Sequence, residues 1–356
     1  MHKLYTSSFD ASIYLQQPEQ NAGRDEILEV GKLYYGSNEV ASAKDIARTL
    51  IKFDVSNLQT GSGWKTYLNL KAAGSEEIPL EYTIYANAVS QSWTMGTGTK
   101  FDNITSDGIS WKYRNGVNSW QDNATAGTAI FSAGTTGSAN AEGGTWYTAS
   151  MASQSFNYQS DDIKMDVTNI VHRWVSGSLP NNGFIIHHNF ITEEDTIDYG
   201  LLKFFSKETH TIYEPTLEVV WDDSSFAPTG SITAMPVDDF KVTITNLKSK
   251  YNSNTKTKIK VRGRELFPIK DFADTFNYSD IKYLPQTSYY QLEDYLTEEI
   301  IFPFGNYTKL SCDSSGSYFV LDLQSLPIDR IYKLKLKVVI DNIDYVFDEK
   351  YTFQIV

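Results

Sequence analysis

Short runs of β-branched and aromatic residues, bounded by glycine, asparagine, aspartate or serine, recur along the whole chain. In its first part such runs include 82–86, 183–188 and 216–221. Further on, 256–262 and 332–338 alternate basic and apolar residues, which is the pattern of a strand with one face in solvent. Closely spaced short strands are typical of sandwiches and jelly rolls. We therefore predict an all-β fold, in which a jelly-roll-like sandwich precedes a smaller immunoglobulin-like sandwich.

Two segments depart from this strand pattern. Residues 166–177 begin with residues that cap helices, end at a glycine, and carry apolar residues at helical spacing, namely Val167, Ile170, Val171 and Trp174. They predict one amphipathic helix. The tyrosine-rich stretch 272–304 is less regular, and we expect a short helix in it around 291–297.

A change of composition near residue 226 divides the chain. All seven tryptophans and all five histidines precede it. Residues 1–226 hold 27 acidic and 15 basic residues (net −12), and residues 227–356 hold 17 and 16 (net −1), which together give −13. The segment 222–230 contains a proline and a glycine without any periodic pattern, as linkers do. We predict two domains, 1–226 and 231–356.

Charge and cysteine content exclude several classes of protein. A net charge of −13 disfavours binding to nucleic acid or to an anionic membrane, because both need a basic surface. No apolar run approaches the roughly 18 residues that a membrane span requires. The single cysteine, Cys312, allows neither an internal disulfide nor a cysteine-based zinc cluster. The first residues lack the apolar segment of a secretion signal, so we expect synthesis and assembly in the cytoplasm.

A series of short motifs follows the order of a known family. It includes an arginine before an apolar run ending in Phe-Asp at 47–54, a tryptophan-containing turn at 92–98, the segment 107–111, and Pro215 before the last strand. Together, residues 10–221 resemble the DNRLRE domain, a β-sandwich family common in surface-exposed and polysaccharide-associated proteins of bacteria and archaea. The resemblance covers about three-fifths of the chain. It implies a sandwich fold more firmly than any function.

The resemblance and the missing secretion signal together favour a virion protein. Members of the family usually follow such a signal, whereas a surface-type architecture without one is expected of a bacteriophage protein assembled inside its host. We predict a non-enzymatic structural or accessory protein of a tailed-phage virion, in the neck, collar or tail. Its partners would be other virion proteins and further copies of itself, with no nucleic acid and no membrane. The alternative is a carbohydrate-binding or adhesion module of a bacterial surface protein, with a cell-surface glycan as partner.

No motif predicts catalysis or a cofactor. His187 and His188 precede Glu193, Glu194 and Asp195, but neighbours on a strand face opposite sides and do not readily share one metal ion. We expect one packed and one solvated histidine. The spacings of zinc, serine-nucleophile and phosphate-loop sites are absent. We predict no catalytic residue, no metal and no cofactor.

Aromatic residues in the loop-rich sequence are the candidate sugar-binding residues. Flat rings beside polar side chains suit a sugar, since the rings cover its C–H faces while polar groups bind its hydroxyls. Anchoring of long loops is the other interpretation, and we favour it because tryptophan is highly buried on average. The candidates are Trp93, Trp111, Tyr113, Trp120 and Trp146.

The two alternating strands carry the candidate docking residues. A lysine-rich strand face is usually solvated, and lysine at a sheet edge discourages aggregation. The functional alternative is a surface that docks an acidic partner, such as the N-terminal domain of a neighbouring copy. The candidates are Lys256, Lys258, Lys260 and Arg262 on one strand and Lys333, Lys335 and Lys337 on another.

Overall fold

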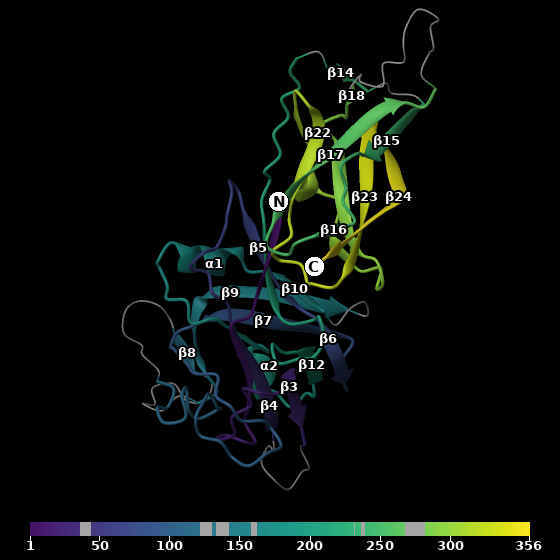
Figure 1. The fold of residues 1–356 in the computed structure, drawn as a ribbon. Helices are drawn as coiled ribbons and strands as arrows, with labels where there is room; N and C mark the ends of the chain where they lie inside the picture. Colours follow the sequence, from purple (N-terminus) through teal and green to yellow (C-terminus); the bar gives the residue numbers. More distant parts are fainter. Residues whose placement is uncertain are drawn as a thin grey trace, which may run out of the picture. The chain divides into compact units, whose positions relative to one another are not determined.

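Strands dominate the computed structural model, which describes residues 1–35, 44–121, 130–132, 142–157, 162–230, 232–235, 239–267 and 282–356 (Figure 1). The helices are α1 (Thr168–Val175), α2 (Phe190–Glu194) and the 3-10 helix η1 (Asn306–Thr308). The predicted all-β sandwich fold is confirmed. Within the described ranges, no helix is both long and apolar enough to span a membrane.

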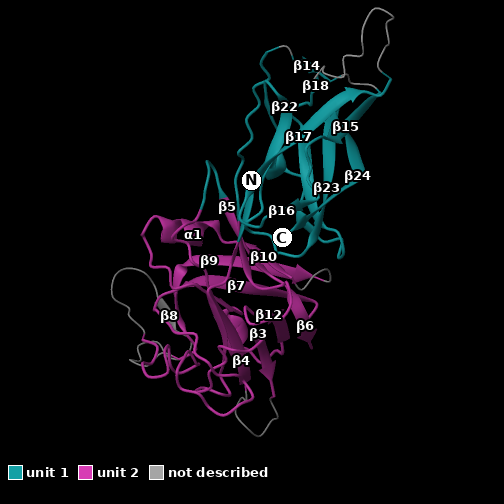
Figure 2. Ribbon diagram, viewed as in Figure 1, with its two compact units in different colours: residues 1–4, 59–64, 219–356 teal, residues 5–58, 65–218 magenta. Residues whose placement is uncertain are grey.

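The chain forms two compact units (Figure 2). Unit 1 contains residues 1–4, 59–64 and 219–356, and unit 2 contains residues 5–58 and 65–218. This division differs from the predicted domains 1–226 and 231–356, because two short N-terminal segments join the later part of the chain. Within unit 1, the His2 ring stacks on Phe302 with 4.7 Å between centroids, and Lys256 Nζ donates to Gln59 Oε1 at 3.0 Å. Segments of four to six residues are too short for their composition to show that they belong to the later part of the chain.

A nine-stranded antiparallel sheet makes up most of unit 2. Its order is β6-β12-β3-β4-β11-β7-β9-β8, and β2 also pairs with β4. Its strands are β2 (Phe9–Tyr14), β3 (Ile27–Tyr34), β4 (Lys44–Lys52), β6 (Ala72–Glu76), β7 (Glu81–Val89), β8 (Ile130–Ser132), β9 (Thr145–Asn157), β11 (Phe184–His187) and β12 (Gly200–Phe205). All described residues of β11 are buried, so this central strand is covered on both faces.

A second sheet of four strands has the order β1-β13-β5-β10. Its strands are β1 (His2–Thr6), β5 (Lys65–Leu70), β10 (Ile163–Asp166) and β13 (Thr216–Val220). Strand β10 leads directly into α1, which buries Ile170, Val171 and Trp174. The Trp174 ring lies 4.6 Å from that of Phe184 on β11. The helix predicted for 166–177 is therefore confirmed, and its apolar stripe is buried inside unit 2.

Unit 1 is a sandwich of two sheets. One has the order β14-β18-β17-β22-β21 with β15 paired to β17, and the other has the order β16-β24-β23-β19-β20. The strands are β14 (Thr233–Ala234), β15 (Phe240–Ile244), β16 (Lys250–Tyr251), β17 (Lys256–Glu265), β18 (Lys282–Tyr283), β19 (Ser288–Asp294), β20 (Ile300–Phe302), β21 (Ser311–Asp313), β22 (Gly316–Asp322), β23 (Ile331–Ile340) and β24 (Ile343–Ile355). The helix expected around 291–297 is wrong, because residues up to Asp294 extend as β19 and pair with β23.

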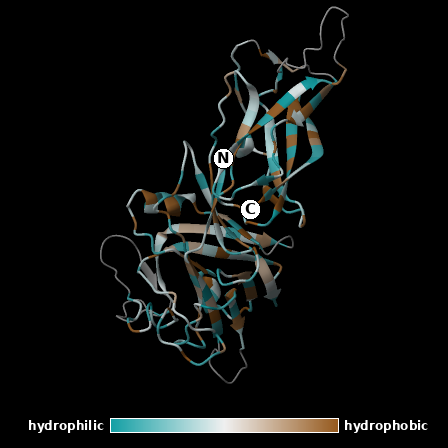
Figure 3. Ribbon diagram, viewed as in Figure 1, coloured by the Kyte–Doolittle hydropathy of each residue, from teal (hydrophilic) through white to brown (hydrophobic). Residues whose placement is uncertain are grey.

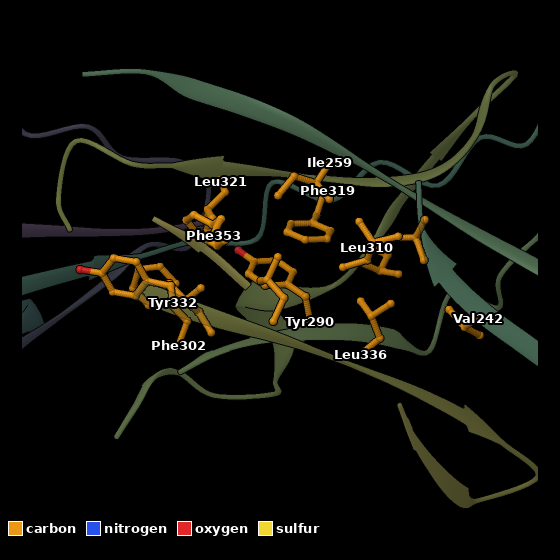
Figure 4. Packing of buried hydrophobic residues seen from close by; sticks show 14 of the residues in the cluster. Val242, Ile259, Tyr290, Phe302, Leu310, Phe319, Leu321, Tyr332, Leu336 and Phe353 are labelled. Atoms are coloured by element: carbon orange, nitrogen blue, oxygen red, sulfur yellow. The ribbon is translucent and has the colours of Figure 1, made fainter. Parts of the chain in front are cut away.

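The core of unit 1 lies between these two sheets (Figure 4). Ile259 of β17 and Phe319 of β22 meet Leu336 of β23 and Tyr290 of β19 in one buried cluster. The Tyr290 and Phe319 rings stack with 4.2 Å between centroids. Hydrophobic and hydrophilic residues alternate along the strands (Figure 3). This period of two is what allows each sheet to bury one face and solvate the other.

Candidate functional site

The tryptophans proposed as sugar ligands lie inside unit 2. Trp111, Trp120 and Trp146 are buried in one apolar cluster that includes Ile13 and Ile185, and partly buried Trp93 packs against it. Trp93 Nε1 donates to Asn182 O at 2.7 Å, and Trp120 Nε1 donates to Ser110 O at 3.2 Å. The three buried rings have no face open to a ligand. Their burial agrees with loop anchoring.

Arg48 of β4 explains why two of these rings come together. Its fully buried guanidinium lies 4.7 Å from the Trp111 ring centroid and 5.1 Å from that of Trp146. Its nitrogens donate to both carboxylate oxygens of Glu193 on α2, at 3.1 and 2.5 Å, and to Gly143 O at 2.6 Å. A planar cation between two aromatic faces with a bidentate carboxylate is a structural clamp. It holds α2 and the 143–146 segment against the sheet.

Tyr113 is the remaining aromatic candidate, and it is only partly buried. It pairs with Ser119 across a narrow turn, and Lys112 Nζ lies 5.2 Å from its ring centroid. Lys112 in turn pairs with Glu19 at 2.9 Å. Trp93 and Tyr113 thus keep partial exposure, whereas the structure does not assemble the five predicted aromatics into one exposed face.

The expectation of one solvated histidine is wrong. His187 and His188 are 5% and 1% exposed. His187 ends β11, which is central in its sheet and covered on both faces. The ring of His188, the next residue, lies 6.5 Å from the Tyr82 ring and 5.5 Å from the Tyr199 ring. Burial lowers the pKa of His187 to about 3 and that of His188 to about 4. His187 Nε2 meets Asn87 Oδ1 at 3.0 Å, whereas neither ring nitrogen of His188 has a hydrogen-bond partner among the described residues.

The acidic residues after the histidines bind cations of unit 2. Glu193 pairs with Arg48, Glu194 with Lys44 at 2.7 Å, and Asp195 with the fully buried Lys32. Lys32 Nζ also donates to Thr192 O at 2.8 Å. Three consecutive ion pairs therefore fix α2 to β3 and β4. In the described part of the chain, no group of three or more histidine, cysteine or acidic residues is arranged to hold a metal ion.

The predicted docking residues do not share one face. β17 and β23 belong to opposite sheets of unit 1, and the apolar residues between their lysines point into the common core. The two basic rows therefore lie on opposite outer faces, because side chains alternate along a strand. Sequence periodicity identifies each row correctly but cannot show how distant strands pair.

Most of these lysines have acidic partners within unit 1. On β17, Lys256 pairs with Asp322 at 3.3 Å and Lys258 with Asp313 at 2.7 Å. The hydrogen bond from Lys258 lowers the pKa of Asp313 to about 2. On β23 the pairs are Lys333–Asp348 at 2.8 Å, Lys335–Glu293 at 2.6 Å and Lys337–Asp344 at 3.1 Å.

The end of β17 differs from the rest of the row. Lys260, Arg262 and Arg264 are exposed at alternate positions, and no ion pair involves them in the described ranges. Arg264 extends the row beyond the residues that the sequence pattern singled out. We call these three residues the basic row of β17.

A buried asparagine, which no sequence motif indicates, organises three loops of unit 2. Asn21 Nδ2 donates to Met95 O at 2.7 Å and to Ile109 O at 2.8 Å, and Asn21 Oδ1 accepts from Gly98 N at 2.7 Å. Glycines leave room for it: a Cβ on Gly108 would lie 2.5 Å from Asn21 Nδ2. One side chain thus joins the loop after β2 to two segments of the 90–110 region.

Replacing Asn21 by alanine should lower the free energy of unfolding by roughly 3 kcal/mol, because it leaves several buried backbone groups without partners at about 1–3 kcal/mol each. Gly108→Ala should also destabilise, since the added methyl collides with Asn21. The measurement is chemical denaturation at equilibrium. Asn103→Ala, in an exposed part of the same region, is the control and should change stability by less than about 0.5 kcal/mol. Equal stabilities of the Asn21 and Asn103 variants would contradict the anchoring role.

Comparisons with known proteins give little. No protein-family model matches the chain, and no curated protein matches it. Among solved structures, the apo structure of Bacteroides uniformis β-glucuronidase 3 matches 87% of this chain and 26% of that chain, at 8% identity and a TM-score of 0.20. The match spans about a quarter of that protein's length. At this TM-score it carries no argument, and the resemblance to the DNRLRE domain stays a prediction.

Proposed function

We propose that the chain is a non-enzymatic structural protein of a tailed-phage virion, in the neck, collar or tail, and that it acts through protein–protein contacts. The basic row of β17 carries the proposal. Three neighbouring cations without ion partners in the described ranges stand on a sheet whose other lysines are paired. Such a row attracts an acidic surface, and residues 1–226 of another copy have a net charge of −12.

Charge reversal tests the contact. Lys260→Glu with Arg262→Glu should abolish self-association that weakens as salt rises, because exposed charges are screened over about 8–10 Å at physiological ionic strength. The control is Lys248→Glu with Lys250→Glu, which changes the net charge equally at exposed lysines of the same unit. Association would be followed by analytical ultracentrifugation at low and high salt. The proposed role of the basic row would be contradicted if both double variants lost self-association equally, or if neither lost it.

The virion assignment needs a separate test. A labelled copy supplied during infection by the phage that encodes the chain should appear at one position on purified particles in negative-stain microscopy. Purified particles that never carry the label would overturn the assignment. The alternative, a carbohydrate-binding or adhesion module, predicts a neighbouring glycosidase or cell-wall-anchor gene instead of portal, sheath or baseplate genes.

A further inference from the structure

The basic row of β17 has a defined length and an apolar end. Lys260, Arg262 and Arg264 occupy alternate positions of one strand. Because a strand rises by about 3.4 Å per residue, the three cations span about 14 Å on one face of the sheet. Leu266 and Phe267 follow directly, and they are 41% and 75% exposed. A partner for this surface must therefore offer negative charge over a similar length, beside apolar side chains.

Four strand ends of unit 2 bring such a set of side chains together. The order β6-β12-β3-β4 is antiparallel throughout, so the end of β6, the start of β12, the end of β3 and the start of β4 lie at one end of the sheet. These four ends carry, in this order, Glu77, Asp198, Tyr35 and Asp45. Neighbouring strands are about 4.8 Å apart, so the set extends over about 14 Å from β6 to β4. We call these four residues the acidic end of unit 2.

The charges of the acidic end surround one exposed ring. Tyr35 is 60% exposed, and desolvation together with the charges of Asp45, Asp198 and Glu77 raises the pKa of its phenol. Glu77 and Asp198 are exposed, and Asp45 is half-buried. Among the residues that the structure describes, no ion pair neutralises these three carboxylates. Ile197, beside Asp198, is 55% exposed and adds apolar surface.

The basic row and the acidic end therefore match in charge, in length and in apolar content. Each presents three charges of one sign over about 14 Å, with exposed apolar side chains next to them. Charge complementarity of this kind selects which surfaces meet and suppresses wrong partners. One polypeptide carries both surfaces, on different units. The surface that fits the basic row is thus present on every other copy, at the same concentration.

We propose that the basic row of one copy docks on the acidic end of unit 2 of the next copy. This inference deepens the proposed function and rests on it, because it names the partner surface of the basic row. The contact is heterologous, since two different surfaces of the same chain meet, and each copy keeps one surface of each kind for its two neighbours. Repetition of such a contact produces a ring when the rotation between copies closes.

Two charge-reversed full-length chains test the contact. The row variant carries Lys260→Glu with Arg262→Glu, and the end variant carries Glu77→Lys with Asp198→Lys. In low salt, sedimentation velocity should show association of the intact chain and a loss of roughly tenfold or more in each variant alone, because like charges then face each other. An equimolar mixture should associate again, because the unchanged basic row of the end variant meets the unchanged acidic end of the row variant. Mixing cannot restore a contact within one chain.

Glu26→Lys with Asp54→Lys is the matched control. Both residues are exposed, next to the opposite ends of β3 and β4, and their reversal changes the net charge equally. This chain should associate like the intact one. Glu77→Gln with Asp198→Asn is a milder variant, which keeps the side-chain oxygen that accepts from Gly200 N. It should weaken association at an unchanged melting temperature.

Three results would overturn the inference. They are a monomeric intact chain in low salt, an end variant that associates like the intact chain, and a mixture that stays monomeric. The second result, with association lost in the row variant, would leave the basic row in the proposed function and reject only this partner surface. If the end variant has a lowered melting temperature, the milder variant decides, and its association must be weaker than that of the intact chain. The labelled particles decide the virion assignment separately.

Discussion

Replacing Glu193 by glutamine is expected to lower the free energy of unfolding by about 3–5 kcal/mol, because the change leaves the buried charge of Arg48 without a counterion. Arg48 is fully buried and Glu193 is 2% exposed. Water cannot screen the unpaired guanidinium, and the rings of Trp111 and Trp146 offer only part of the lost stabilisation. The loss should release α2 from the sheet before the rest of unit 2 unfolds.

A neighbouring residue provides the control for this prediction. Glu194 forms the same type of ion pair with Lys44, but its side chain is 52% exposed. Glu194→Gln should therefore change stability by at most about 1 kcal/mol. Equilibrium denaturation and amide hydrogen exchange in residues 190–195 would measure both variants. A double variant, Arg48→Met with Glu193→Met, should recover much of the loss, since it removes both buried charges. Similar effects of Glu193→Gln and Glu194→Gln would refute the clamp.

Stability is also expected to fall as the pH drops from about 6.5 towards 3. His187 and His188 have pKa values of about 3 and about 4 in the folded chain, because burial disfavours their charged forms. In the unfolded chain histidine titrates near 6.5. The two neutral histidines therefore contribute their full stabilisation to the folded chain above pH 6.5. This stabilisation is lost as the pH falls from about 6.5 towards 3. At about 1.4 kcal/mol per pKa unit, the loss for His187 alone is on the order of 5 kcal/mol.

The surroundings of the two rings govern this behaviour. Arg48 lies near His187 and disfavours its protonation, whereas Glu193 and Asp195 favour protonation of His188 and Lys32 opposes it. His188→Phe should flatten the acid loss, since this ring has no hydrogen bond to lose among the described residues. The exposed His172, changed to phenylalanine, is the control. Parallel curves of stability against pH for His188→Phe and the unchanged chain would contradict the prediction.

Asp10 acts in the opposite direction and must be separated from the histidines. Burial raises its pKa to about 7, and its Oδ1 has no hydrogen-bond partner among the described residues. The protonated Asp10 stabilises the folded chain below about pH 3.9, the pKa of aspartate in the unfolded chain. This stabilisation is lost as the pH rises to about 7. Asp10→Asn should therefore stabilise the chain at pH 8 by roughly 4 kcal/mol and have little effect at pH 4. Curves of stability against pH measured in the Asp10→Asn variant therefore show the effect of the two histidines without that of Asp10.

The fold class could be predicted from the sequence because strands and helices depend on the spacing of apolar residues within a few positions. Alternation along 256–262 and 332–338 specifies which side chains face the core, and helical spacing places Trp174 against the sheet. The same patterns cannot show which strands become neighbours. The sequence therefore could not show that the basic rows of β17 and β23 lie on separate faces. It also could not show that His187 lies in a central strand or that His188 packs beside Tyr82 and Tyr199.

The site residues were harder to predict, for a related reason. Tryptophan stands out in a sequence, yet three of the four candidate tryptophans are buried. Asn21 has no distinctive spacing. It matters because three loops meet around it. This property arises from contacts between residues about 70–90 positions apart.

The chain passes between the two units four times, at residues 4/5, 58/59, 64/65 and 218/219. Cutting the polypeptide once therefore cannot yield the two units as intact fragments, and a fragment that begins at residue 231 lacks pieces of its own sandwich. During synthesis, unit 2 is complete once residue 218 has emerged, whereas residues 1–4 and 59–64 belong with residues 219–356, which are made later. Unit 1 can therefore complete its sandwich only if these early segments stay accessible until its later strands have emerged.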